Sequence, residues 1–149
     1  MRPGIADQLD AIGRTLAEIV LPEIAAPYPK EILSGAIAAL CALADTLPKL
    51  PEFLVWDAEG TGAVLAAALP LLDPGRAGAI RATLAERAPA AADLPGLERR
   101  QETLRGLLVT AMPAILAERG PAYRAMVDHM RARAERFPFA ISATLPKLK

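Results

Sequence analysis

At 149 residues, the chain has the length of a single domain (1–149) and is long enough to bury a core. Alanine supplies 32 residues, valine supplies five, and aromatic residues make up 4%. Since alanine is the best helix former and strands prefer β-branched and aromatic residues, this composition favours an all-α fold and argues against a β-sheet. The formal net charge is zero, which is not the strongly basic balance of a nucleic-acid-binding chain.

The charges are unevenly spread along the chain. Residues 1–75 carry 4 basic and 10 acidic side chains, a net charge of −6, whereas residues 119–149 carry 7 and 2, a net charge of +5. The two ends can pack near each other or remain solvated. Alternatively, the C-terminal region forms a basic surface for an acidic partner or an anion.

The cysteine content and the N-terminus suggest a cytoplasmic protein. Cys41 is the only cysteine, so no disulfide can form within the chain, and its apolar surroundings favour an inert core thiol. The first residues, MRPGIADQLD, lack the apolar stretch of a signal peptide. The uncharged run Thr61–Leu72 is shorter than the roughly 20 residues that a bilayer span needs, so no membrane span is expected.

The hydrophobic spacing predicts six helices in a compact up-down or orthogonal bundle, several of them broken by proline. The helix over Pro29–Leu47 is predicted to be the central one, because large apolar residues fill one arc and small residues fill the other. Glu52–Leu72 is expected to break at Gly60-Thr61-Gly62, and Pro113 is expected to kink a later helix. The other predicted helices cover Pro3–Val20, Pro74–Ala88, Gly96–Arg119 and Pro121–Arg136, and an irregular tail follows from about residue 138.

The residues that most often carry chemistry form no recognisable catalytic or metal-binding motif. His129, the only histidine, lies off the apolar arc of its predicted helix and is expected at the surface. Glu98 and Glu102 lie among arginines that include Arg105, which is typical of a solvated ladder of charges. We therefore predict no metal, no cofactor and no enzymatic activity.

A few aromatic and flexible side chains are the candidates for recognition. Trp56 and Asp57, with Phe53 nearby, form the aromatic-rich patch, and tryptophan is enriched at binding hot spots, although Trp56 can equally anchor a core. The further candidates for binding a partner or a ligand are Tyr28, Met126 and Met130.

The stretch Glu18–Leu40, EIVLPEIAAPYPKEILSGAIAAL, resembles small uncharacterised helical proteins of bacteria. In these proteins a short helix ends in Val/Leu-Leu-Pro, a Pro-Tyr turn follows, and a long apolar helix begins. Some of these proteins accompany kinases like the aminoglycoside phosphotransferases, and acyl-CoA dehydrogenases. The resemblance implies an accessory role beside a metabolic enzyme, and it carries no catalytic residue.

The leading interpretation is a non-enzymatic accessory protein that packs its helices against itself or against a partner enzyme. The alternative is a small bundle that holds an apolar or acyl-type ligand between its helices, in a cavity lined by the 29–47 helix, Met126 and Met130. Because the hydrophobic content is 53%, above the usual 45–50%, we expect excess apolar surface and a homodimer. Its predicted interface includes Glu52–Leu72, with Trp56 near the centre.

Overall fold

In the computed structural model, residues 4–138 are described, and within this range the chain forms six α-helices and no strand. The all-α prediction is confirmed. The predicted tail lies outside the described residues beyond Pro138. The helices are α1 (Ile5–Thr15), α2 (Pro27–Thr46), α3 (Leu50–Ala68), α4 (Pro74–Ala85), α5 (Leu94–Glu118) and α6 (Pro121–Arg136).

The chain divides into two compact units. Unit 1 comprises residues 1–50 and 138–149, of which 4–50 and Pro138 are described, and unit 2 comprises Pro51–Phe137. The boundary between the units falls at the start of α3. Unit 1 therefore holds the first two helices, and unit 2 holds α3 to α6.

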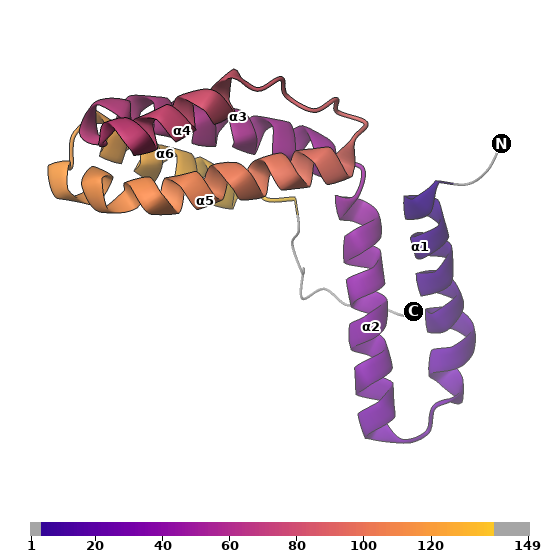
Figure 1. Cartoon of the computed structure of the whole chain (residues 1–149). Coiled ribbons are helices and arrows are strands. Elements are labelled where there is room, and N and C mark those ends of the chain that lie inside the picture. Colours follow the sequence, from indigo (N-terminus) through magenta and orange to yellow (C-terminus); the bar gives the residue numbers. More distant parts are fainter. Residues whose placement is uncertain (1–3, 139–149) are drawn as a thin grey trace. The chain divides into compact units, whose positions relative to one another are not determined.

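Unit 1 is a helical hairpin in which α1 and α2 lie side by side and run in opposite directions (Figure 1). A π-helical turn, Leu16–Val20, and a 3₁₀ turn, Leu21–Glu23, follow α1. Gly13 makes the close approach between the helices, since a Cβ at this position would lie 3.4 Å from Cys41 Sγ. Leu21, Ile37 and Ala44 supply the buried apolar side chains of the hairpin.

The predicted central role of the 29–47 helix is wrong. The buried residues of α2 are Ile37, Ala44 and Thr46, and on the small-residue side no other part of residues 4–138 lies within 4 Å of the Cβ position of Gly35. In the described part of unit 1, α2 packs against α1 and the two turns after it, which cover one side of α2. An apolar helix therefore keeps an exposed apolar side.

The core of unit 2 is organised around α3 instead. Val64, Leu65 and Ala68 of α3 are buried among side chains from the other three helices of the unit. The short helix α4 places Ile80 fully inside. The remaining buried members of this cluster are Leu104, Leu108, Ala111, Ile115, Ala122 and Met126.

The predicted break at Gly60-Thr61-Gly62 does not occur, because α3 runs through it. These two glycines serve close packing: an ideal Cβ on Gly60 would overlap the His129 ring, and one on Gly62 would lie 3.2 Å from Leu84 Cδ2. Pro113 likewise lies inside the continuous helix α5.

The helix ends follow the expected cap chemistry. Asp73 caps α4, since Asp73 Oδ1 accepts a hydrogen bond from the backbone N–H of Arg76 at 3.0 Å. Asp93 caps α5 in the same way through the N–H of Gly96, which moves its start to Leu94. At the other end, Arg119 closes α5 in the left-handed conformation, with φ 51°.

The segment Leu50–Leu71 is long and apolar enough to cross a membrane, judged by its length and composition alone. The core helix of a globular unit passes the same test. Here α3 places Asp57, Thr61 and Leu65 inside unit 2, where each is exposed by 1% or less. Of the most apolar stretch of this segment, 33% is buried inside the structure.

Candidate functional site

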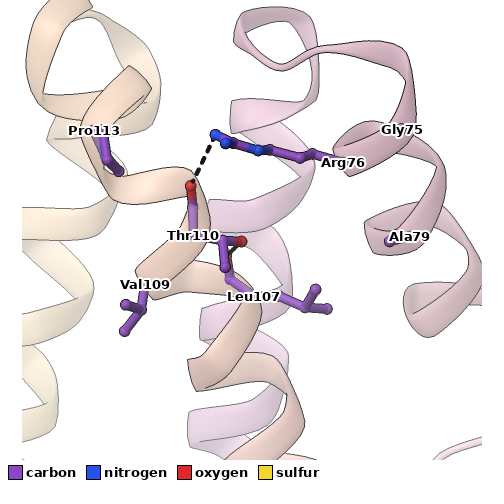
Figure 2. A pocket seen from close by; sticks show the side chains of 7 residues that line it. All are labelled: Gly75, Arg76, Ala79, Leu107, Val109, Thr110 and Pro113. Atoms are coloured by element: carbon purple, nitrogen blue, oxygen red, sulfur yellow. Dashed lines mark hydrogen bonds between the residues drawn. The ribbon is translucent and has the colours of Figure 1, made fainter.

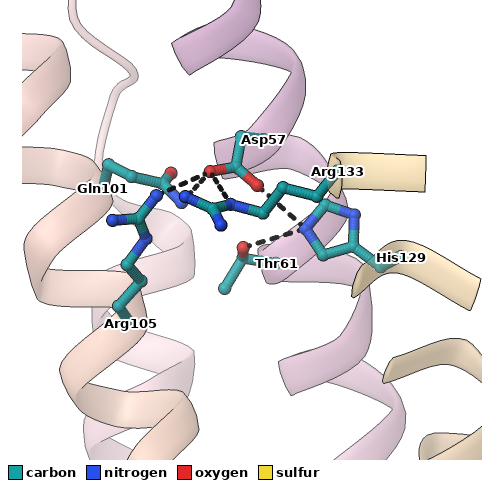
Figure 3. A network of polar contacts seen from close by, with 6 residues as sticks. All are labelled: Asp57, Thr61, Gln101, Arg105, His129 and Arg133. Atoms are coloured by element: carbon teal, nitrogen blue, oxygen red, sulfur yellow. Dashed lines mark hydrogen bonds and ion pairs between the residues drawn. The ribbon is translucent and has the colours of Figure 1, made fainter. Parts of the chain in front are cut away.

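A buried carboxylate, Asp57 of α3, is the centre of the polar interior of unit 2. Its Oδ2 accepts hydrogen bonds from Gln101 Nε2 at 2.6 Å, Arg133 Nε at 3.0 Å and Arg105 Nη2 at 3.1 Å. Asp57 is fully buried because it lies on the same side of α3 as Thr61 and the apolar core residues that follow. One oxygen atom therefore ties α3 to both α5 and α6 (Figure 3).

The second oxygen of Asp57 faces His129 of α6. His129 Nε2 lies 3.1 Å from Asp57 Oδ1 at ion-pair distance, but the pair does not have hydrogen-bond alignment, and Oδ1 makes no hydrogen bond. The same nitrogen lies 3.3 Å from Thr61 Oγ1. The expectation of a surface histidine is wrong, because the space above Gly60 admits the ring to the backbone of α3.

This constellation is not arranged for catalysis by a hydroxyl nucleophile. In a catalytic triad the acid and the nucleophile contact different nitrogens of the histidine, whereas Asp57 and Thr61 both contact Nε2. Thr61 is also 1% exposed, so a substrate would not reach its hydroxyl. The network is therefore arranged to hold three helices together.

Two guanidinium groups neutralise the Asp57 carboxylate and exceed it by one positive charge. The side chain of Arg133 is 28% exposed and that of Arg105 is 47% exposed, so the excess charge reaches solvent. A buried carboxylate without such partners would be strongly unfavourable. Within residues 4–138, no group of three or more His, Cys, Asp or Glu residues is placed to hold a metal ion.

An aromatic and cationic layer covers this network. The Trp56 ring lies 5.3 Å from the His129 ring and 5.9 Å from Phe53, and the guanidinium of Arg136 lies 4.6 Å from the Trp56 ring centre. Phe53 also makes an edge-to-face contact with Phe137 at 5.4 Å. Trp56 and Phe53, both candidates for recognition, thus pack within unit 2 through aromatic and cation–π contacts.

The two methionine candidates are not brought together. Met126 is buried in the core cluster of unit 2, whereas Met130 is 40% exposed. Three open grooves on unit 2, with volumes of about 560, 550 and 330 Å³, are lined by neither methionine. In the first of them, Arg76 reaches from α4 to the carbonyl of Thr110 on α5 (Figure 2).

The sixth candidate, Tyr28, lies on a different kind of surface. Seven of the large apolar side chains that are strongly exposed belong to unit 1, although it is the smaller unit. By contrast, unit 2 exposes Val109, Leu116, Met130 and Phe137. The seven exposed residues of unit 1 are Ile5, Ile12, Ile19, Val20, Tyr28, Ile32 and Leu43.

Sequence reasoning missed the partners of Asp57. Arg105 was assigned to a solvated ladder, Arg133 to the basic C-terminal region, and Gln101 was not singled out. A signal was present in α5, since Gln101 lies four residues after Leu97 and three before Leu104, both buried. A polar residue within an apolar stripe indicates a buried hydrogen bond.

No protein-family model matches the chain, and no curated protein or solved structure is significantly similar to it. The resemblance of Glu18–Leu40 to small bacterial helical proteins therefore stays a prediction.

Proposed function

We propose that this is a non-enzymatic interaction protein, which binds another protein through the exposed apolar side of the α1–α2 hairpin. The observation that carries the proposal is the concentration of exposed large apolar residues on unit 1. Exposed large apolar residues that gather on one part of a protein commonly mark an interaction site. The accessory role beside a metabolic enzyme and the cytoplasmic location, both inferred from the sequence, belong to the same proposal.

The interior of unit 2 supports this proposal because its polar residues are used in structure. Asp57, Thr61 and His129 are buried, and their contacts join helices. The alternative function, binding of an apolar or acyl-type ligand, stays a prediction. Within unit 2, Met126 is buried in the core cluster and Met130 is 40% exposed, so the two side chains do not face one shared space.

The proposal is tested by recovering tagged protein from the native host after chemical cross-linking. Wild type is compared with Ile12→Glu on the hairpin and with Leu116→Glu on α5, since the two residues are 50% and 45% exposed. We expect the wild type and Leu116→Glu to retain the same cross-linked proteins and Ile12→Glu to lose them. If all three proteins recover the same set, the hairpin is not the binding surface.

A further inference from the structure

The exposed residues of the hairpin form two stripes, one on each helix. At 100° per residue, the stripe on α1 and its π turn follows a spacing of three and four residues, and the stripe on α2 does likewise. All ten residues are exposed. The stripes are Ile5, Gln8, Ile12, Thr15 and Ile19 on the first helix, and Tyr28, Ile32, Ala36, Ala39 and Leu43 on α2.

Both stripes lie on the same side of the hairpin. The contact of Gly13 with Cys41 and Leu40 shows which sides of the two helices face each other. Viewed from its own N-terminus, each helix carries its exposed stripe in the same rotational sense from that contact, by roughly 120° on α1 and 130° on α2. Because the helices run in opposite directions, the same sense of rotation brings both stripes to one side, which we call the hairpin face.

The hairpin face carries no charged residue. The charges of α1, such as Asp7, Asp10 and Arg14, lie on the other side of the helix, and Arg14 pairs with Asp10 at 2.8 Å. The one hydroxyl on the α1 stripe, Thr15 Oγ1, donates to the carbonyl of Ala11 at 3.0 Å. The face is therefore suited to a dry, helix-to-helix contact.

The shape of the hairpin face is complementary to a second copy of the same face. The α1 stripe presents isoleucines at positions 5, 12 and 19, seven residues apart, whereas the middle of the α2 stripe presents Ala36 and Ala39. Large side chains on one helix can enter the gaps beside small ones on the other, as in helical bundles. A two-fold axis parallel to the hairpin places α1 of each copy on α2 of the other.

The area of the face also fits. At about half exposure each, the six large apolar residues of the face present on the order of 600 Å², about three quarters of the roughly 800 Å² per partner in a standard interface. A hairpin of two helices buries too little apolar surface to be stable by itself, and association is a common remedy. A homodimer is also the commonest closed assembly.

We infer that the hairpin face binds the hairpin face of a second copy of this chain, and that the two hairpins form a four-helix bundle. This inference rests on the proposed function and names its partner. It replaces the dimer interface predicted around Trp56, whose ring is occupied by Arg136, His129 and Phe53.

Sedimentation equilibrium of the full chain at micromolar concentrations tests the assembly. We expect a wild-type dimer, a dissociation constant at least tenfold higher for Ile12→Glu, and no change for Leu116→Glu. Trp56 fluorescence checks that unit 2 is folded in Ile12→Glu and Leu116→Glu, and cooperative urea unfolding followed by circular dichroism checks it in Trp56→Ala. A wild-type monomer, or a dimer that survives Ile12→Glu but dissociates in Trp56→Ala, overturns the inference.

Cross-linking between two singly substituted proteins tests the arrangement. Gly13 is level with Leu40 and Cys41, and the helices are antiparallel, so Ile12 is level with Cys41 and Ala42 and the nearest stripe residue of the other copy is Leu43. Ile12→Cys and Leu43→Cys, each combined with Cys41→Ser, should form a covalent heterodimer on mixing and oxidation, whereas Arg14→Cys should not replace Ile12→Cys. Efficient cross-linking of Ile12→Cys to itself would place α1 on α1 and overturn the arrangement.

The two proposals fail separately. A wild-type monomer whose cross-linked partners in the host still depend on Ile12 would overturn self-association and leave the interaction function standing. A monomer whose partners are insensitive to Ile12→Glu would overturn both.

Discussion

Replacing Asp57 with asparagine should destabilise unit 2 by about 3 kcal/mol, because removal of one member of a buried charge network leaves the other members uncompensated. The carboxylate is fully buried, and its Oδ2 accepts three hydrogen bonds, two of them from arginines. An asparagine keeps the shape but loses the charge. It can accept these bonds with its carbonyl oxygen only if its amide N–H₂ then faces His129 in place of Oδ1.

Trp56 is the only tryptophan, and its ring packs at a tilt against His129 beside the network, so its fluorescence reports the unfolding of unit 2. With a urea dependence of about 1–3 kcal/mol per molar, a loss of about 3 kcal/mol lowers the midpoint by roughly 1–3 M. Glu59→Gln is the matched control, since Glu59 is an exposed carboxylate on the same helix and should change stability by less than about 0.5 kcal/mol. If Asp57→Asn shifts the midpoint no more than Glu59→Gln does, the network does not hold the helices together.

Four further results are expected. Gly60→Ala should lower the stability of unit 2 by about 1–3 kcal/mol, because its methyl group would overlap the His129 ring, whereas Gly78→Ala, which has open space around it, should raise stability by up to about 1 kcal/mol; equal effects in urea denaturation would contradict the packing role of Gly60. Arg119→Gly should raise stability by about 0.5–1 kcal/mol, because glycine adopts φ 51° without the steric cost of a side chain, and a loss would show that this side chain compensates for it. Arg133→Gln should destabilise unit 2 more than Arg105→Gln, since Arg133 is the less exposed partner of Asp57, and the reverse order in urea midpoints would contradict that reasoning. The hydrogen bond from the Arg76 N–H lowers the pKa of Asp73 below 3.8, so its contribution is complete above that pH and is lost as the pH falls through the folded-state pKa; the stability difference between wild type and Asp73→Ala should therefore shrink in acid, and a constant difference would contradict it.

Local features of the fold were predictable because they depend on neighbouring residues. The helical class follows from the alanine content, and the start of α4 follows from the Asp73-Pro74 pair. The stop at Gly120-Pro121 is equally local, although the structure uses Arg119 as the left-handed residue. These signals act on the backbone within a few residues of their position in the sequence.

The site was only partly predictable because burial depends on residues far apart in the chain. Asp57 was singled out for recognition, yet its partners lie 44 to 76 residues further along. The apolar residues of α6 predicted a buried side that included Met130, whereas the structure buries Met126 and His129, three residues apart. Apolar spacing cannot identify a polar side chain whose desolvation a partner on another helix offsets.

The central helix was misassigned for a related reason. Small and large apolar residues on α2 show that both sides can be packed, but they do not say by what. In the described part of unit 1, one side meets α1, and the other belongs to the uncharged hairpin face. Excess hydrophobicity in a short helix thus indicates a partner as readily as a core.

The buried polar network and the exposed apolar face therefore belong to different units, and this division has a measurable consequence. The Asp57 network lies wholly within unit 2, while the hairpin face lies wholly within unit 1. Substitutions at distant sites with no shared partners are usually additive. Asp57→Asn should therefore lower the urea midpoint followed by Trp56 fluorescence and leave the dissociation constant of the dimer unchanged. Ile12→Glu should instead raise the dissociation constant and leave the urea midpoint unchanged. If Ile12→Glu lowers the Trp56 midpoint as much as Asp57→Asn does, at a concentration where the wild type is dimeric, the stability of unit 2 is coupled to assembly and the division is wrong.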